Sequence, residues 1–265
     1  MFPTGHRRNR ALLASTTVVV AALVTVLTSA CSDSSQPQPS GGGTTTGATT
    51  TETAAAPGDA LEEGIYFYPS VEGATLSYAN SGMGAGTTEV TVDSVSSDAQ
   101  GQIVNVTEVV SGDGTAPVTV ERSFRTGADG SLVISADAFG AFGSSFTVTA
   151  VGDDILIPGI AELSAGNESS GETFVDMSGS GVEMHNEVTY TVSGVGAESV
   201  TVAAGTAEAY VVEIALEITS SLTGTTTPGT ARYWFVPGFG LAKQEMNLLS
   251  MTLATELTAS SVPLP

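Results

Sequence analysis

Apolar and polar residues alternate with a period of two in two long stretches of this sequence. Between residues 182 and 192, Val, Met, Asn and Tyr occupy the even positions, and Glu, His and Thr occupy the odd ones. Residues 212–218 repeat the pattern, with Val, Ile and Leu at the even positions and Glu at two of the odd ones. Successive side chains of a strand point to opposite faces, so each stretch predicts a strand with one apolar face.

Shorter stretches of the same character predict an all-β fold. Residues 64–80 are expected to open with aromatics and a Pro-containing turn and to continue as a strand. A short apolar segment lies at 155–158, and further strands are predicted at 87–96, 102–110, 118–125, 131–135, 146–151, 198–203, 208–219, 231–236 and 241–257. In the last of them the apolar positions change parity near Leu248 and Leu249, where we expect a bulge. The links have hairpin length, which predicts a meandering antiparallel sheet. Its apolar face must be covered, by curling into a half-barrel or barrel or by packing in a sandwich.

The N-terminal segment has the composition of a secretory signal. Three arginines lie in the first ten residues, and residues 11–30 are apolar or small. The only cysteine, Cys31, stands where this run ends. The stretch from Leu27 to Cys31 resembles a bacterial lipobox, although Thr28 stands where Leu is usual. The resemblance implies that Cys31 carries a diacylglyceryl group, whereas an uncleaved membrane helix is the alternative.

The next segment predicts a spacer between membrane and domain. Residues 32–60 are rich in Ser, Gly, Thr, Gln, Pro and Ala, without periodic apolar positions. Such a segment cannot bury a core, and it should behave as a flexible coil spanning about 30 Å. We therefore divide the chain into a signal peptide at 1–30, the lipidated cysteine and linker at 31–60, and a β-sheet domain at 61–265.

The charge balance excludes several classes of partner. After Cys31 the chain has four basic and 28 acidic residues, a formal charge of −24. Such a surface repels nucleic acid and anionic lipid headgroups. With no second cysteine and a single histidine after Cys31, disulfides and Cys/His zinc sites are also excluded, and we expect no cofactor.

Three stretches carry a family resemblance: 66–73 (YFYPSVEG), 198–206 (ESVTVAAGT) and 230–243 (TARYWFVPGFGLAK). Together they resemble uncharacterised secreted bacterial proteins and lipoproteins, whose fold resembles the half-barrel of the periplasmic lipoprotein and lipid carriers. The chain departs from the pattern at Ala203, usually Pro, and at Ala207, usually Phe. The resemblance implies a shape and no catalytic residue.

The residues suited to chemistry do not form a known catalytic or metal-binding pattern. His185 is flanked on its strand face by Glu183 and Glu187, which favour the imidazolium over a neutral base. No G-x-S-x-G motif occurs. Asp153 and Asp154 lack the spacing of a calcium loop. We therefore predict no enzymatic activity and no metal site.

Two hypotheses of function remain for an extracytoplasmic lipoprotein anchored to the membrane by the lipid on Cys31. In the first, the curved sheet binds a hydrophobic or lipid-like small molecule. In the second, it is a structural or protein-interaction lipoprotein with a filled core. Trp234 is expected to lie in the core. The residues predicted to face a ligand are Val188, Tyr190, Val212, Ile214, Leu216, Leu249, Met251 and Leu253.

Overall fold

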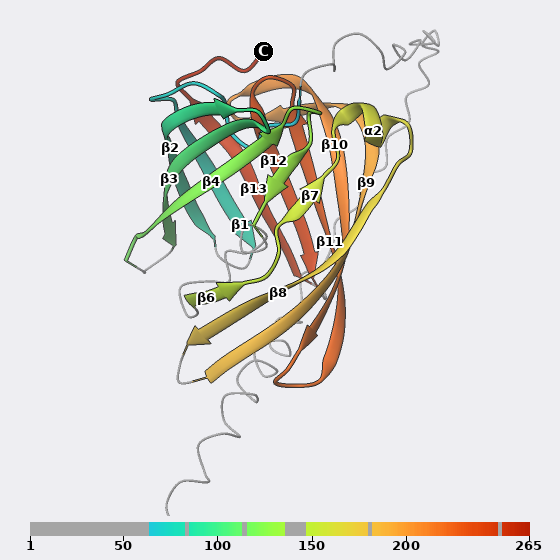
Figure 1. Cartoon of the computed structure of the whole chain (residues 1–265). Coiled ribbons are helices and arrows are strands. Elements are labelled where there is room, and N and C mark those ends of the chain that lie inside the picture. Colours follow the sequence, from blue (N-terminus) through green and yellow to red (C-terminus); the bar gives the residue numbers. More distant parts are fainter. Residues whose placement is uncertain (1–63, 83–84, 113–115, 136–146, 180–181, 249–250) are drawn as a thin grey trace, which may run out of the picture. The chain divides into compact units, whose positions relative to one another are not determined.

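A single antiparallel sheet of 13 strands forms in the part of the chain that the structure describes (Figure 1). The structure is a computed structural model that describes residues 64–82, 85–112, 116–135, 147–179, 182–248 and 251–265. The predictions for the signal, Cys31 and the linker lie outside these residues. The sheet curls into a half-barrel, which confirms the predicted all-β fold.

The strands follow the chain in two meanders that are joined by the pairing of the last strand with the first. The order across the sheet is β6-β8-β9-β10-β11-β12-β13-β1-β2-β3-β4-β5-β7. The strands are β1 (Thr75–Gly82), β2 (Gly86–Asp98), β3 (Gly101–Gly112), β4 (Val118–Gly127), β5 (Leu132–Ile134), β6 (Thr147–Val151), β7 (Ile155–Ile157), β8 (Ser169–Gly179), β9 (Val182–Val202), β10 (Gly205–Ser220), β11 (Thr225–Val236), β12 (Gly240–Leu248) and β13 (Met251–Ser260). The short helix α2 (Ile160–Ser164) follows β7.

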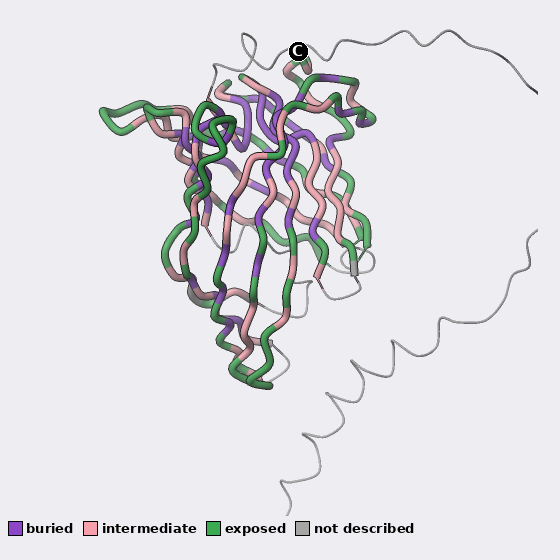
Figure 2. The backbone as a smooth tube through the Cα atoms, turned by 90° about the vertical axis from the view of Figure 1, so that its right-hand side faces the viewer, coloured by how far each residue is buried: buried purple, intermediate pink, exposed green. Residues whose placement is uncertain are grey.

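The core lies on the concave face, where one parity of each strand supplies apolar side chains. Tyr78 of β1 pairs with Leu257 of β13, and Val212 of β10 pairs with Tyr233 of β11. All four are at most 2% exposed. Figure 2 shows that buried residues gather toward one end of the sheet, while exposed residues predominate at the other.

The segment of residues 64–73, here called the strap, crosses the concave face at its buried end. At one side the Ile65 amide donates to the Gly130 carbonyl at 3.1 Å, and at the other the Leu241 amide donates to the Phe67 carbonyl at 3.0 Å. Between these bonds the Phe67 ring stacks on Phe124 of β4, with centroids 4.4 Å apart. The strap therefore ties the β4–β5 turn to β12 and closes this end of the half-barrel.

Trp234 is buried, as predicted, but on the convex side of the sheet. Its strand neighbours Tyr233 and Phe235 face the concave side, so Trp234 faces the opposite way. It is 8% exposed, and its Nε1 donates to Glu198 Oε2 at 3.3 Å. Arg232 and Lys243 lie over its ring, 5.0 and 5.2 Å from the centroid. Because Glu198 belongs to β9 and Trp234 to β11, this contact links two strands that lie on either side of β10.

Several sequence predictions need correction at the level of single strands. β8 was not predicted, and the stretches 182–192 and 198–203 belong to one strand, β9, of 21 residues. The strand predicted at 241–257 is two strands, because Leu248 pairs with Met251 and the chain reverses between them. The parity change near Leu248 therefore marks a hairpin and not a bulge.

Candidate functional site

The inward side chains of the concave face become less buried with increasing distance from the strap. Next to the strap its side chains are fully buried, as for Leu76 and Val106 at 1% exposure. Further from the strap, the inward positions Asn80 of β1 and Thr88 of β2 are half-buried. The concave face therefore has one end that is filled by buried side chains and one end that is half-buried. The candidate site lies where the two ends meet.

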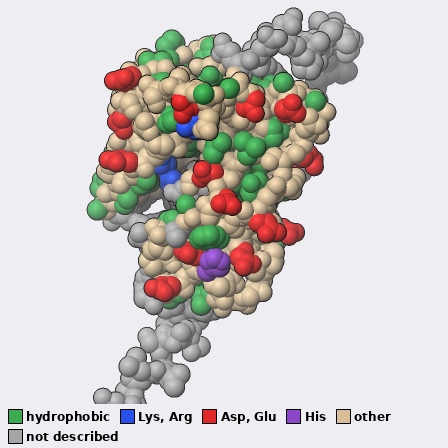
Figure 3. Space-filling view, viewed as in Figure 1, with side chains coloured by type: hydrophobic (Ala, Val, Ile, Leu, Met, Phe, Trp, Pro, Cys, Tyr) green, Lys and Arg blue, Asp and Glu red, His purple; other side chains and the backbone are tan. Residues whose placement is uncertain are grey.

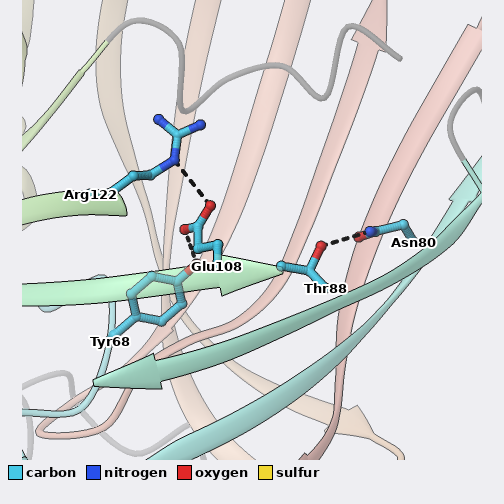
Figure 4. A network of polar contacts seen from close by, with 5 residues as sticks. All are labelled: Tyr68, Asn80, Thr88, Glu108 and Arg122. Carbon is cyan, nitrogen blue, oxygen red and sulfur yellow. Dashed lines mark hydrogen bonds and ion pairs between the residues drawn. The ribbon is translucent and has the colours of Figure 1, made fainter. Parts of the chain in front are cut away.

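A charged pair lies on the core parity of β3 and β4. Glu108 follows Val104 and Val106 at the same alternation, and Arg122 precedes Phe124 in the same way. Arg122 Nε donates to Glu108 Oε2 at 3.0 Å, and the Tyr68 hydroxyl of the strap donates to Glu108 Oε1 at 2.8 Å (Figure 4). Glu108 is 7% exposed. Both carboxylate oxygens thus accept hydrogen bonds inside an otherwise apolar region.

The two partners offset the cost of burying the Glu108 charge. Removing a carboxylate from water costs several kcal/mol unless it is paired and hydrogen-bonded. Arg122 supplies the opposite charge, so the pair is neutral as a unit. Burial, and then the Glu108 charge, raise the pKa of the Tyr68 hydroxyl, which keeps it protonated and able to donate.

The neighbouring strands continue this polar character across the sheet. Asn80 Nδ2 donates to Thr88 Oγ1 at 2.9 Å (Figure 4). Thr255 Oγ1 donates to Asn80 Oδ1 at 3.0 Å, and Gln244 pairs with Thr255 on the same face. Six consecutive strands, from β12 through β13 and β1 to β4, thus each contribute a polar side chain to this part of the concave face. We call this set the polar arc: Gln244, Thr255, Asn80, Thr88, Glu108 and Arg122.

Apolar side chains border the polar arc away from the strap. On β12 and β13 the next inward pair is Met246 and Leu253. Met246 is 5% exposed and Leu253 is half-buried. On β9 and β10 the inward residues include Val188 and Leu216. Val188 and Leu216 are themselves buried, at 7% and 3% exposure, so the half-buried apolar residues at this end are Leu253, Met184 and Ile218.

Five of the eight predicted ligand-facing residues lie together on this concave face. Tyr190 pairs with Leu216, while Val188, Val212 and Ile214 occupy the same parity of β9 and β10. Val212 and Ile214 have no exposed surface, so they fill the core.

The other three predicted residues lie at or near the β12–β13 turn. Leu253 pairs with Met246 and packs partly buried against the core. Met251 pairs with Leu248, and Leu249 lies outside the described residues. Contact of any of the eight residues with a ligand stays a prediction.

Sequence reasoning missed the polar arc, although part of its signal was visible. Glu108 stands at an apolar position of the predicted strand 102–110, and Arg122 stands between Val120 and Phe124 in the alternation of 118–125. A charge at such a position indicates a buried ion pair. Asn80, Thr255 and Gln244 gave no comparable signal, because an uncharged polar side chain does not by itself distinguish one face of a strand from the other.

Every basic residue after Cys31 is paired with an acid. Besides Arg122, Arg125 binds Asp98 at 2.9 Å, Arg232 binds Glu198, and Lys243 binds Glu245 and Glu256. Acidic side chains are spread over the face that Figure 3 shows, where basic ones are few. The excess charge of the domain is therefore negative, with no cluster of basic residues to attract an anion.

The one histidine of the described residues lies at the surface, beside an acid. His185 Nδ1 lies 2.5 Å from Asp176 Oδ1 at an exposed position on β9 and β8. Among the described residues, no group of three or more His, Cys, Asp or Glu side chains could hold a metal ion. In the same part of the chain, no helix has the length and apolar character needed to cross a membrane.

Comparison with known proteins gives a family and a fold. Residues 72–248 match the protein family described as DUF3108-like, for which no catalytic function is indicated. The structure resembles a candidate lipoprotein from Parabacteroides distasonis, with a TM-score of 0.59 and 16% identity over 76% of this chain and 100% of that one. It also resembles a candidate exported protein with a YmcC-like fold from Bacteroides fragilis, with a TM-score of 0.58 and 16% identity over 75% and 100%. No curated protein matches the sequence.

Proposed function

The chain belongs to the DUF3108-like family, and we propose that it is an extracytoplasmic lipoprotein, anchored through Cys31, that binds a hydrophobic or lipid-like molecule on the concave face of its sheet. The observation that carries the binding proposal is the change along this face from filled core to half-buried lining. An apolar molecule placed there removes the remaining apolar surface from water, at roughly 25 cal/mol per Å².

The location of the protein is proposed from its sequence and its relatives. The basic, apolar and lone-cysteine segments of residues 1–31 have the order of a lipoprotein signal. The two similar structures are a candidate lipoprotein and a candidate exported protein, which supports an envelope location for this chain. Two or more acyl chains hold a protein stably on a membrane, so a diacylglyceryl group on Cys31 is a sufficient anchor.

Binding is tested with the mature chain from residue 32, secreted without its lipid. The protein is stripped of bound lipid, and native mass spectrometry and melting temperature are recorded with a long-chain alkane and a monoacylglycerol. A one-to-one complex and a raised melting temperature are expected, because only the folded state offers the concave face. If neither molecule binds, the proposal is wrong.

The second candidate function is that of a structural lipoprotein with no ligand. The observation in its favour is the filled end of the concave face, where Tyr78, Tyr233 and Phe235 are at most 2% exposed. A core that is filled along its whole length would leave no space for a guest. The same titration distinguishes the two functions, because this one predicts no complex with either molecule.

A further inference from the structure

We infer that the polar arc binds the uncharged, hydroxyl- and ester-bearing headgroup of an acylglycerol, while the acyl chain lies over the apolar residues farther from the strap. This inference rests on the proposed ligand-binding function and specifies its substrate class. It is carried by the register of the sheet, by the charge balance of the arc and by the hydrogen-bonding capacity of its side chains.

The register makes the arc one continuous surface. Gln244 lies opposite Thr255, and Thr255 lies opposite Asn80. Thr88 bonds to Asn80, and Glu108 lies on the next strand, opposite Val90. Neighbouring strands lie about 4.8 Å apart, so the six strands spread the arc over about 24 Å. A small polar headgroup therefore contacts only the central members of the arc, Thr255, Asn80 and Thr88.

The arc lies between two apolar regions, which gives a bound amphiphile a direction. Toward the strap it meets Tyr78 and Leu257, which are fully buried and leave no room for a chain. Away from the strap it meets Met246 and Leu253, and Leu216 lies on the same face beyond β11, on β10. A headgroup at the arc therefore directs its acyl chain away from the strap.

The charge of the arc selects an uncharged headgroup. Its two ionic members, Glu108 and Arg122, are bonded to each other, so their charges compensate. The rest of the domain is strongly acidic, which disfavours a phosphate or carboxylate headgroup. A cationic headgroup would find Glu108 already bonded to Arg122 and Tyr68.

The remaining members of the arc have capacity for hydroxyl and carbonyl partners. Thr88 Oγ1 accepts from Asn80, which leaves the Thr88 hydroxyl proton to donate. The Asn80 amide uses one of its two N–H groups on Thr88. Thr255 Oγ1 donates to Asn80 and retains lone pairs that can accept. Donors and acceptors side by side suit the free hydroxyls and ester carbonyl of an acylglycerol.

The test compares headgroups on chains of equal length, using the stripped mature chain. The ligands are an alkane, a monoacylglycerol, a fatty acid above its pKa and phosphatidylglycerol, and the measurement is affinity by native mass spectrometry and displacement of a fluorescent apolar probe. The monoacylglycerol is expected to bind about tenfold or more tightly than the alkane, from the hydrogen bonds that it adds. The two anionic lipids are expected to bind less tightly than the monoacylglycerol.

A double variant tests whether the preference for monoacylglycerol over alkane arises at the polar arc. Thr88→Val with Thr255→Val removes two hydroxyls at nearly constant volume and should reduce the preference for monoacylglycerol over alkane about tenfold. The matched control is Thr219→Val with Thr226→Val, an exposed cross-strand pair whose hydroxyls lie 2.8 Å apart. It should leave the preference unchanged. The single variants replace the double one if it does not fold.

The outcomes separate this inference from the proposed function. If alkane and monoacylglycerol bind equally, if an anionic lipid binds best, or if the double variant keeps the full preference, the headgroup inference is overturned and ligand binding stands. If no ligand binds, the proposed function and the headgroup inference are both overturned.

Discussion

Glu108 occupies a strand position where the alternation would otherwise place a valine, and its two partners keep it there. Arg122 and Tyr68 come from β4 and the strap, so one buried carboxylate links three segments. A buried ion pair seldom stabilises a fold more than apolar residues of similar volume would. Stability alone therefore does not account for this pair, and its position next to a half-buried lining fits the ligand binding that we propose for the concave face.

Mutation of the pair can separate the cost of an unpaired charge from the value of the pair itself. Arg122→Leu leaves Glu108 buried without its counter-charge and should lower the free energy of unfolding by about 3 kcal/mol. Glu108→Leu combined with Arg122→Leu removes both charges and should cost clearly less than the single change. Urea unfolding of both variants checks this. Equal losses would mean that the charges do not interact in the folded protein.

Three buried tyrosines predict how stability depends on alkaline pH. Burial raises the pKa of Tyr68, Tyr78 and Tyr233 above the ordinary value of about 10. Because the folded-state pKa is the higher one, the folded protein keeps these protons while the unfolded chain releases them. This stabilisation is fully present below about pH 10 and is lost as the pH rises further, by about 1.4 kcal/mol per pH unit for each tyrosine.

Alkaline unfolding curves and phenolate absorbance test this together. The absorbance of the three tyrosines should rise only when the protein unfolds, and Tyr68→Phe should reduce the pH slope of stability by one proton. Reversible ionisation of all six tyrosines in the folded protein would contradict the account.

At the scale of elements, the sequence was informative where one face of a strand is strongly apolar. Residues 182–192 and 212–218 alternate clearly, and β9 and β10 contain them. β8 escaped prediction because Ser169–Gly179 is rich in Ser and Gly and carries few apolar residues, so its pairing with β9 decides its structure. The β12–β13 hairpin escaped because no Gly, Pro or Asp marks its turn.

The strap is the element whose loss should affect the fold most directly. Its Phe67 ring contacts Phe124 on one wall and Phe235 on the other, with centroids 4.4 and 6.2 Å away. Phe67→Ala should lower the free energy of unfolding by about 3–5 kcal/mol, through lost burial and the cavity that remains. The neighbouring Tyr66 is half-buried, so Tyr66→Ala is the matched control with a smaller loss. Similar losses for both variants in urea unfolding would contradict the role assigned to the strap.

At the scale of the whole molecule, three features fit an envelope protein held at a membrane without binding its surface. The formal charge after Cys31 is −24, which repels anionic headgroups. The proposed linker at 32–60 gives the domain reach, and the proposed lipid supplies the attachment. The structure describes neither segment, so both stay predictions from the sequence.

The anchor is tested by changing its attachment atom. Cys31→Ser removes the sulfur that would carry the lipid, so the protein should lose lipoprotein-type processing and leave the membrane fraction. Ser32→Ala should remain lipidated. The measurement is the intact mass of the mature chain together with membrane fractionation. A wild-type chain that begins elsewhere and keeps a free Cys31 thiol would show that the anchor is assigned wrongly.

The central claim is that the concave face holds a lipid, and the most direct measurement is of what the protein carries when it is isolated from its own envelope. The mature protein is purified, its non-covalently bound lipid is extracted with organic solvent, and the extract is quantified and identified by mass spectrometry. The anchor stays behind because it is covalent. We predict close to one uncharged acylglycerol-type lipid per chain. An extract with no lipid in stoichiometric amount would contradict the claim and leave a structural lipoprotein with a filled core.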